Sequence, residues 1–358
     1  MTLPDLPRLL SWGRDEGALV EFGCSAHLER CAGTLAALAS QSASLSKHVS
    51  SLSALPGPGM LEILDAPETG HFVRLAHDGR IEDLVAFLEE ACDAESVRYG
   101  LQGPSRRLWA AKGDACFAPG ETNWFAPRLS GDVVIDTRSP RARRPLQVSA
   151  FRESSLGDAT PWLTQTEGHV WQKVEDAWQL LAEISPEAHR FVRSSIRCVI
   201  PRQNLDDEEF FTSSSSRRYV GRMILLNPHL PGVSREHLVS AFVHEAIHSY
   251  LYRLEYEARF APAELSLSAE LISPWSGGRI RLTTYIHACF VYYGLASLWS
   301  TKTARMHADR NAAILAQARA VVGFKGRAFL EPLRPYLATV EPQVREQLES
   351  LSAIAQLA

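Results

Sequence analysis

Two histidines and a glutamate in the second half of the chain have the spacing of a metal-binding helix. They stand in the segment His244-Glu245-Ala246-Ile247-His248, an HExxH motif. Residues four apart on a helix project from one face, so both imidazoles can reach a single cation at ligand distances of roughly 2.1 Å. The segment therefore predicts a metal centre, with Glu245 beside it as a candidate catalytic residue.

The residues around the motif predict a long, mostly buried helix from about Ser234 to Glu257. Ser234 is a favourable N-cap, and Glu236 places negative charge in the first turn, where the helix dipole favours it. The rest of the helix is largely apolar. Two imidazoles on such a helix need polar partners, because burying an unpaired polar group is costly. A bound metal would supply them, as would hydrogen bonds within a protein core.

A catalytic metal of this kind needs a third protein ligand. Glu255 shares the helix face with His248, but seven residues of helix separate the two by about 10.5 Å, which is too far for a shared ion. The remaining candidates are Glu264, Glu270 and His287. His287 lies within the apolar stretch 282–294, where a lone polar side chain needs a reason.

The elements that must position these residues are mainly helical. Apolar periodicity predicts further helices at about Cys24–Leu52, Ile81–Cys92, Gln165–Glu183 and Arg279–Trp299, with two or three more at the end of the chain. Short apolar runs predict strands at Asp132–Asp136, Leu146–Phe151, Ser195–Pro201 and Tyr219–Asn227. We therefore expect a predominantly helical α+β fold in which a small sheet precedes the motif helix, a zincin-like local arrangement.

Near residue 160 the sequence changes from short segments interrupted by Gly, Pro and Arg to longer stretches with helical periodicity. We expect residues 1–160 to form a mixed, partly helical region that could recognise a peptide, and residues 161–358 to form the metal-binding catalytic region. A loop rich in Pro, Trp and Gly at Ser273–Gly278 precedes the helix that carries His287.

Composition narrows the class of protein. The net charge of -4 does not suggest a nucleic-acid-binding protein, which typically carries clustered positive charge. The six cysteines contain no C-x-x-C pair, which argues against a zinc ribbon and favours reduced thiols. No secretion signal opens the sequence, and no apolar run reaches the roughly 18 residues of a membrane span. We expect a soluble cytoplasmic protein with no nucleic-acid or membrane partner.

Three segments resemble one particular family. They are Val243–Ser249, Ser273–Arg279 and Tyr285–Val291, preceded by the similar runs Thr212–Arg217 and Met223–Asn227. The chain resembles, over roughly residues 165–300, the HExxH-motif proteins of ribosomal-peptide natural-product clusters, which are 2-oxoglutarate-dependent peptide β-hydroxylases.

This resemblance implies iron(II) as the metal, with 2-oxoglutarate and dioxygen as co-substrates. It implies that His244, His248 and His287 are the metal ligands and that the substrate is a side-chain β-carbon of a ribosomally made precursor peptide. Glu245 is then not needed as a general base and is expected to orient a ligand or a bound water. Three histidines also suit zinc, so the ligands alone do not decide the metal.

An arginine is expected to bind the far carboxylate of 2-oxoglutarate. Arg279 lies about 80° and Arg281 about 120° from His287 around a continuous helix, which favours Arg279 if the helix includes it. Thr283, one turn before His287, could line the site. Other arginines remain candidates, namely Arg217, Arg218 and Arg235.

Two rival interpretations stay open. In a zinc-dependent metallopeptidase, Glu245 would deprotonate a zinc-bound water, and Glu264, Glu270 or His287 would be the third ligand. Leu251 stands where the metzincin continuation has glycine, which excludes metzincins but not other zincins. In a non-enzymatic binding module, the metal would be structural or absent. The sequence predicts neither the modified residue nor the oligomeric state.

Overall fold

The chain forms two compact units whose segments interleave along the sequence. The computed structural model describes residues 3–13, 17–140, 142, 167–203, 210–256 and 258–354. One unit, here called the motif unit, comprises residues 1–23, 166–195 and 228–358. The other, the sheet unit, comprises residues 24–165 and 196–227. The division expected from the sequence was contiguous, and its boundary near residue 160 lies outside the described residues.

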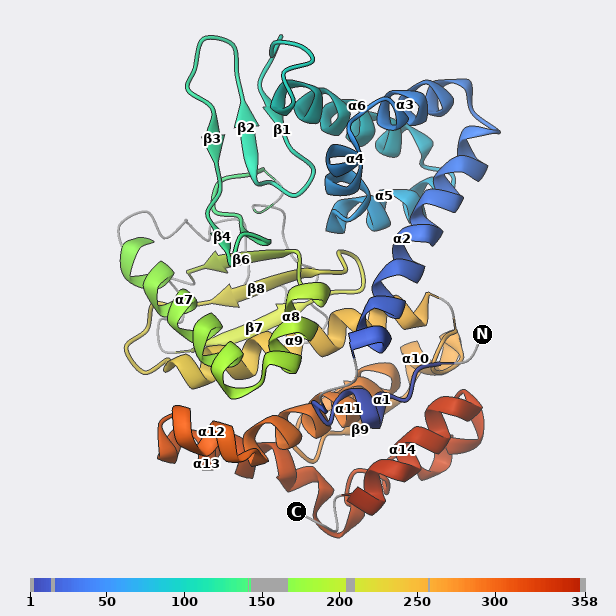
Figure 1. The fold of residues 1–358 in the computed structure, drawn as a ribbon. Coiled ribbons are helices and arrows are strands. Elements are labelled where there is room, and N and C mark those ends of the chain that lie inside the picture. The colour runs from blue at the N-terminus through green and yellow to red at the C-terminus, as the bar shows by residue number, and fades with distance from the viewer. Residues whose placement is uncertain are drawn as a thin grey trace. The chain divides into compact units, whose positions relative to one another are not determined.

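The motif unit is almost entirely helical (Figure 1). Its elements are α1 (Leu6–Leu9), α7 (Glu167–Ile184), α8 (Pro186–Ser195), α9 (Arg235–Glu255), α10 (Ala263–Ser268), β9 (Glu270–Ile272), β10 (Arg279–Arg281), α11 (Leu282–Ser300), α12 (Lys302–His307), α13 (Arg310–Val321), the 3-10 segments η1 (Val322–Arg327) and η2 (Arg334–Thr339), and α14 (Pro342–Ile354). Helix α2 (Gly17–Ala39) begins in this unit and continues in the sheet unit. The only strands described here are β9 and β10, which form an antiparallel hairpin.

Helix α9, which carries the motif, begins at a reciprocal cap. The Ser234 Oγ atom accepts a hydrogen bond from the His237 amide at 3.3 Å, and the His237 Nδ1 atom accepts one from the Ser234 amide at 3.2 Å. The sequence predicted the cap at Ser234 but not that the His237 side chain would accept a hydrogen bond in it. Both amides would otherwise lack a partner at the helix start, so this exchange fixes the first turn of α9.

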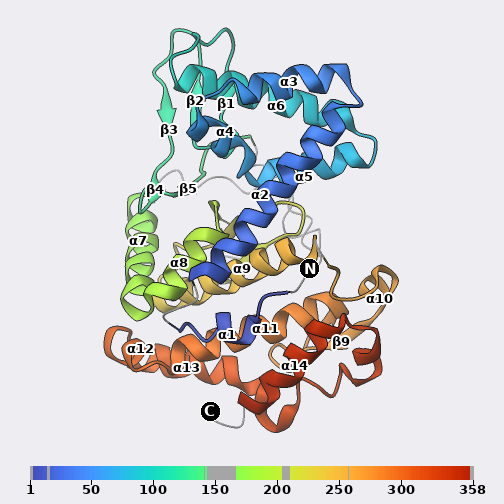
Figure 2. The same ribbon diagram turned by 45° about the vertical axis from the view of Figure 1, so that its right-hand side comes forward.

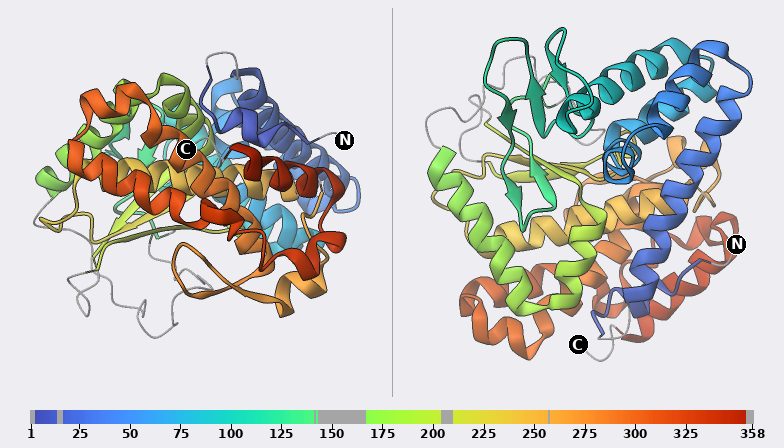
Figure 3. Two further views of the ribbon diagram at one scale, coloured as in Figure 1. Left: turned by 90° about the horizontal axis from the view of Figure 1, so that it is seen from below. Right: turned by 45° about the horizontal axis from the view of Figure 1, so that its top comes forward.

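The apolar side of α9 packs against α7, α8 and α11 (Figures 1 and 3). The Phe242 ring meets Trp178 of α7 edge-on with a centroid distance of 5.3 Å, and the Tyr250 ring lies 5.2 Å from Phe191 of α8. All four side chains are buried. These large rings fix α9 in the centre of the motif unit, which holds the histidines of the motif in place.

Segments that lie far apart in the sequence pack together in the motif unit, where α1 lies beside α11 and α14 (Figure 2). The Leu3 and Leu6 amides donate hydrogen bonds to the side-chain oxygens of Gln343 and Gln347 at 2.7 and 3.1 Å. Helix α1 therefore completes the packing around the helix that carries His287.

The sheet unit combines helices with two small sheets. Its helices are α3 (Ala43–Ser53), α4 (Gly57–Leu64), α5 (Pro67–His77) and α6 (Ile81–Arg98), and its strands are β1 (Leu108–Trp109), β2 (Ala115–Phe117), β3 (Trp124–Phe125), β4 (Arg128–Leu129), β5 (Val133–Ile135), β6 (Cys198–Arg202), β7 (Thr212–Ser215) and β8 (Arg222–Leu226). The larger sheet has the order β4-β5-β6-β8-β7, parallel in its centre and antiparallel at both edges. Strands β6 and β8 are buried along their whole length, as their apolar sequences indicate.

The predominantly helical α+β class is confirmed, and strands appear at three of the four expected places, as β5, β6 and β8. The fourth, at Leu146–Phe151, lies outside the described residues. The expected single helix over 24–52 is wrong, because Ser42 caps a new helix through the Leu45 amide and so separates α2 from α3.

Helix α11 also begins later than expected. Arg279 to Arg281 pair with β9 as a strand, and the helix starts at Leu282. None of the helices in the described ranges combines the length and apolar composition that crossing a membrane requires. No disulfide joins the cysteines whose side chains the structure describes.

Candidate functional site

The motif histidines lie on one stripe of helix α9. His237, Ser240, His244 and His248 follow one another at intervals of three or four residues, so they share one face. The rings of His244 and His248 are neighbours, with centroids 4.9 Å apart. Both side chains are partly buried, in contrast to the fully buried residues between them.

His287 of helix α11 meets this stripe at His248. The Nδ1 atoms of the two imidazoles are 3.2 Å apart, and their ring centroids are 5.4 Å apart. His287 is 1% exposed. Two nitrogens that each lie about 2.1 Å from one cation are roughly 3.0 to 3.4 Å apart, so this pair has the spacing of two ligands of one ion. The same distance also fits a hydrogen bond between two neutral rings.

A buried carboxylate lies on the other side of His287. The Oε2 atom of Glu255, in the last turn of α9, is 3.5 Å from the Nε2 atom of His287. The Nε2 atom is buried and makes no hydrogen bond within the described part of the chain. The sequence excluded Glu255 as a metal ligand because of its distance from His248. It did not predict that His287 of another helix would place its imidazole between Glu255 and His248.

Aromatic rings surround the three imidazoles. Tyr252 and Phe260 lie 4.9 and 5.6 Å from His287, measured between ring centroids. Tyr292 meets His244 edge-on at 6.0 Å and stacks on Trp275 at 4.6 Å with an angle of 7° between the planes. Trp275 comes from the predicted Pro/Trp/Gly-rich loop, so this loop contributes a wall of the site.

The environment keeps the central imidazole neutral. Burial, followed by the charges that His244 and His287 would carry, holds the pKa of His248 well below its usual range. A neutral imidazole has a lone pair to donate, which is the form that binds metals. The site therefore presents nitrogen donors near neutral pH without first having to lose a proton at His248.

The three histidines do not form a finished metal-binding set. Across residues 3–354, apart from the undescribed gaps, no group of three or more His, Cys, Asp or Glu side chains is arranged to hold a metal ion. The pair of His248 and His287 has suitable spacing, and His244 adjoins it through its ring. Binding of one ion by all three would require the imidazoles to turn about their side-chain torsions.

On helix α9, Glu245 projects from a different face than His244 and His248. Its side chain is buried, with 2% exposed. Its negative charge raises the pKa of Tyr292, where burial is the larger cause and the Arg319 charge opposes both. Glu245 is therefore electrostatically close to the phenol that contacts His244.

The residues proposed to bind 2-oxoglutarate occupy the hairpin and the start of α11. Arg279 and Arg281 are both exposed on β10, so the helical angle used to favour Arg279 does not apply. Thr283 is half-buried one turn before His287. Within the described part of the chain, no hydrogen bond, ion pair or ring contact joins the side chains of these three residues to His244 or His248. The alternative ligands Glu264 and Glu270 are exposed.

The other candidate arginines have local partners. Arg235 contacts Glu236 at 3.2 Å and donates to the His307 carbonyl at 3.1 Å. Arg218 belongs to the sheet unit, where it donates to His71 Nε2 at 3.2 Å. Arg217 also belongs to that unit. These contacts give Arg235 and Arg218 a structural setting of their own.

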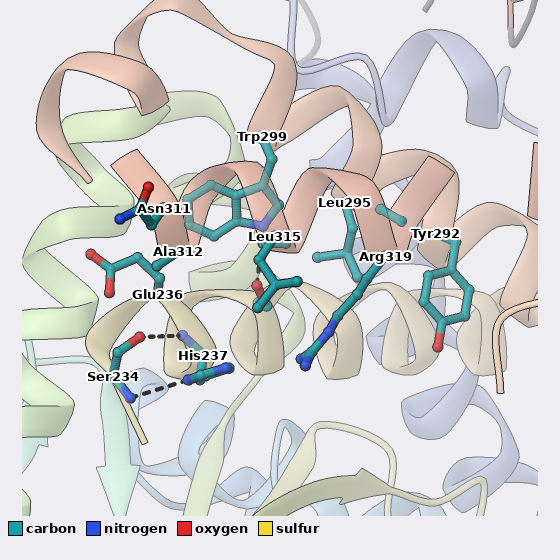
Figure 4. A pocket seen from close by; sticks show the side chains of 13 residues that line it. Ser234, Glu236, His237, Tyr292, Leu295, Trp299, Asn311, Ala312, Leu315 and Arg319 are labelled. Atoms are coloured by element: carbon teal, nitrogen blue, oxygen red, sulfur yellow. Dashed lines mark hydrogen bonds between the residues drawn. The ribbon is translucent and has the colours of Figure 1, made fainter. Parts of the chain in front are cut away.

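A cavity of about 370 Å³ opens between α9, α11 and α13, next to the histidines. Figure 4 shows Tyr292 and Arg319 extending toward α9 from the two other helices. Tyr292 lines the cavity and also contacts His244, so it is shared by the two places. Nothing in the sequence motif indicated Arg319, because the cavity depends on the packing of three helices.

Comparison with known proteins does not assign a family to this geometry. No protein-family model and no curated protein matches the sequence. The interpretation of the site therefore depends on the motif and on the contacts described above.

Proposed function

We propose that this chain is an iron(II)- and 2-oxoglutarate-dependent oxygenase that hydroxylates a side-chain β-carbon of a ribosomally made precursor peptide. His244, His248 and His287 would hold the metal. The observation that carries the proposal is the meeting of imidazoles from two helices, with the Nδ1 atoms of His248 and His287 only 3.2 Å apart.

The donor set supports a metal that binds an anionic co-substrate. Three imidazoles are neutral ligands, so the ion would keep its full positive charge, which favours the carboxylate and keto oxygens of 2-oxoglutarate. When bound, iron(II) with 2-oxoglutarate and dioxygen would supply the oxidising power for hydroxylation. The choice of iron over zinc comes from the resemblance, since both metals accept histidine.

The surrounding residues have supporting parts in this proposal. Glu255 would orient the His287 ring, as carboxylates behind metal-bound histidines do. Phe260, Tyr252 and Tyr292 would limit the access of water to the imidazoles. Arg279 and Arg281, exposed on β10, and the half-buried Thr283 stay candidates for binding 2-oxoglutarate.

The peptide substrate and the cytoplasmic setting are also proposals. A precursor peptide needs a recognition surface, and residues 1–160 remain the expected place for it. A reducing compartment suits a chain whose described cysteines form no disulfide.

A zinc peptidase is the second candidate. The HExxH motif favours it, because Glu245 stands next to His244 at the position of the general base in such enzymes. The charge of Glu245 also contributes, after burial, to the raised pKa of Tyr292. In that enzyme Glu245 would act as the general base. Its 2% exposure argues against this part, because a base must reach a water molecule at the metal.

The test is anaerobic reconstitution with iron(II), followed by an assay of oxygen-dependent conversion of 2-oxoglutarate to succinate, with and without candidate peptides. Metal content would be measured in the same samples. The variants are His244→Ala and His287→Ala, and the matched control is His307→Ala, an exposed histidine of the same unit.

We expect succinate formation that both site variants lose and the control retains. A chain that binds no metal would overturn the metal centre itself. Bound metal without succinate, but with zinc-dependent peptide cleavage that Glu245→Gln abolishes, would assign the peptidase instead.

A further inference from the structure

The cavity between α9, α11 and α13 has the build of a binding site for a small ligand. Its volume of about 370 Å³ falls in the range of roughly 300–1,000 Å³ typical of small-molecule pockets. Leu295, Trp299 and Leu315 form apolar walls, and Ala312 and Ala316 keep the space between the helices open. Figure 4 shows the long side chains around this space.

Most polar groups of the lining already have partners. Ser234 and His237 bond each other in the cap of α9. Ser240 accepts a hydrogen bond from the Trp299 indole at 3.0 Å, and Glu236 accepts one from the Asp309 amide at the same distance. These groups shape the wall and leave little hydrogen-bonding capacity for a ligand.

Arg319 and Tyr292 differ from these bonded groups, as does the Asn311 side chain, which has no hydrogen bond in the described part of the chain. In the described part of the chain, Arg319 has no ion pair and the Tyr292 hydroxyl has no hydrogen bond. The Arg319 charge acts on both sides of the cavity, since it lowers the pKa of His237 after the larger effect of burial and opposes the rise in the pKa of Tyr292. A guanidinium without an ion pair and a phenol hydroxyl, next to apolar walls, are complementary to a ligand that has both an anionic group and an apolar part.

We infer that this cavity binds a carboxylate carried on a short apolar chain, with Arg319 and the Tyr292 hydroxyl as its donors. The planar guanidinium can pair with both carboxylate oxygens, and the apolar chain would lie against Leu295 and Leu315. The inference needs no metal and does not depend on the proposed oxygenase activity.

The position of the cavity gives this site its significance. Ser240 is the lining residue of α9 nearest to the motif, and one helical turn of about 6 Å separates it from His244. Such a carboxylate could belong to a free dicarboxylate or to an acidic side chain of a peptide. Both share the chemistry that Arg319 recognises, and either would approach the imidazoles past Tyr292.

The test is a ligand-observed NMR titration of metal-free, EDTA-treated protein. The probes are hexanoate and the uncharged 1-hexanol. Arg319→Gln should weaken hexanoate binding about tenfold or more and leave 1-hexanol unchanged, because only the charged hydrogen bonds are lost. Arg310→Gln is the matched control, since Arg310, like Arg319, is an exposed arginine of α13 but lines a neighbouring cavity of about 180 Å³ instead of this one.

Two further probes distinguish the sources of the carboxylate. Binding of 2-oxoglutarate alone indicates a free dicarboxylate, and binding of N-acetylglutamate N-methylamide alone indicates a peptide side chain. Absence of hexanoate binding at millimolar concentration would overturn the inference, as would equal affinity of wild type and Arg319→Gln. Ala316→Leu, which fills the space, should weaken hexanoate and hexanol alike if both occupy the cavity.

Discussion

The Oε2 atom of Glu255 lies 3.5 Å from the Nε2 atom of His287, so a buried carboxylate of the motif helix adjoins the imidazole that α11 contributes. Both side chains are almost completely buried. At this distance the contact is electrostatic and longer than an ordinary hydrogen bond. It leaves the Nδ1 atom of His287 directed at His248 and gives Glu255 a positioning part in the proposed centre.

Glu255→Gln should weaken metal binding by about 10- to 100-fold, because the neutral amide no longer places a negative charge beside the His287 ring to hold its orientation. The dissociation constant for Zn²⁺ or Fe²⁺ would be measured by competition with a chelator. Glu264→Gln, an exposed glutamate of the same unit, is the control. Unchanged metal affinity in Glu255→Gln would remove the positioning role.

Metal binding should stabilise the folded chain. An ion at 100 times its dissociation constant adds about 2.7 kcal/mol to the free energy of unfolding if only the folded state binds it. We therefore expect Zn²⁺ to raise the melting temperature and EDTA to reverse the rise, as followed by differential scanning fluorimetry. His248→Ala should abolish the response and His307→Ala should keep it. An identical response in both variants would place the ion elsewhere.

Gly294→Ala should destabilise the motif unit. A methyl group there would lie 2.6 Å from Ile247 Cδ1 and 3.2 Å from the Trp12 ring, and Ile247 is fully buried between the two motif histidines. We expect a loss of about 1–3 kcal/mol in urea unfolding, partly offset by the better helix propensity of alanine. Gly33→Ala, on α2 with open space around it, should instead be stabilising. A stabilised Gly294→Ala variant would show that α9 and α11 can separate freely.

The stability of the sheet unit should fall as pH rises from about 4.5 to about 7. Burial, opposed in part by Arg98, raises the pKa of Glu95 from 4.5 to about 7. The folded chain thus keeps this proton over a pH range in which the unfolded chain has lost it, so folding is weakened progressively, by roughly 3 kcal/mol at full effect. Below pH 4.5 this contribution vanishes.

Glu95→Gln should remove that dependence. Relative to Glu95→Gln, the wild type should be less stable at pH 8 than at pH 5, as measured by urea unfolding at the two values. Glu89→Gln, an exposed position of the same helix, should follow the wild type. The same difference at both pH values would mean that Glu95 stays charged throughout.

Local signals predicted the motif helix well. Ser234 and the apolar pattern located α9 to within two residues, since a cap and a helical period are encoded in neighbouring residues. The start of α11 was missed because Arg279 to Arg281 form a strand only by pairing with β9, a partner that periodicity does not reveal. Ser42, which caps the start of α3, was a local signal for a new helix, but the continuous apolar pattern around it obscured that signal.

The candidate site was predicted where one helix defines it and missed where several meet. The spacing of His244 and His248 is a property of α9 alone. Glu255, Tyr292 and Arg319 acquire their places through the packing of α9, α11 and α13, which no short sequence pattern encodes. His287 lies against His248, and its role as a metal ligand remains a prediction.

The packing of α1 against α14 limits the order in which this part of the fold can form during translation. The hydrogen bond between Leu3 and Gln343 spans 340 residues, and at 5–20 residues per second the ribosome needs roughly 20 to 70 s to supply the second partner. Until then the apolar face of α1, including Leu6 and Leu9, has no α14 to cover it. The nascent chain therefore presents an early hydrophobic segment that chaperones could hold, and the helix bearing His287 reaches its final packing only after residues 342–354 have been made.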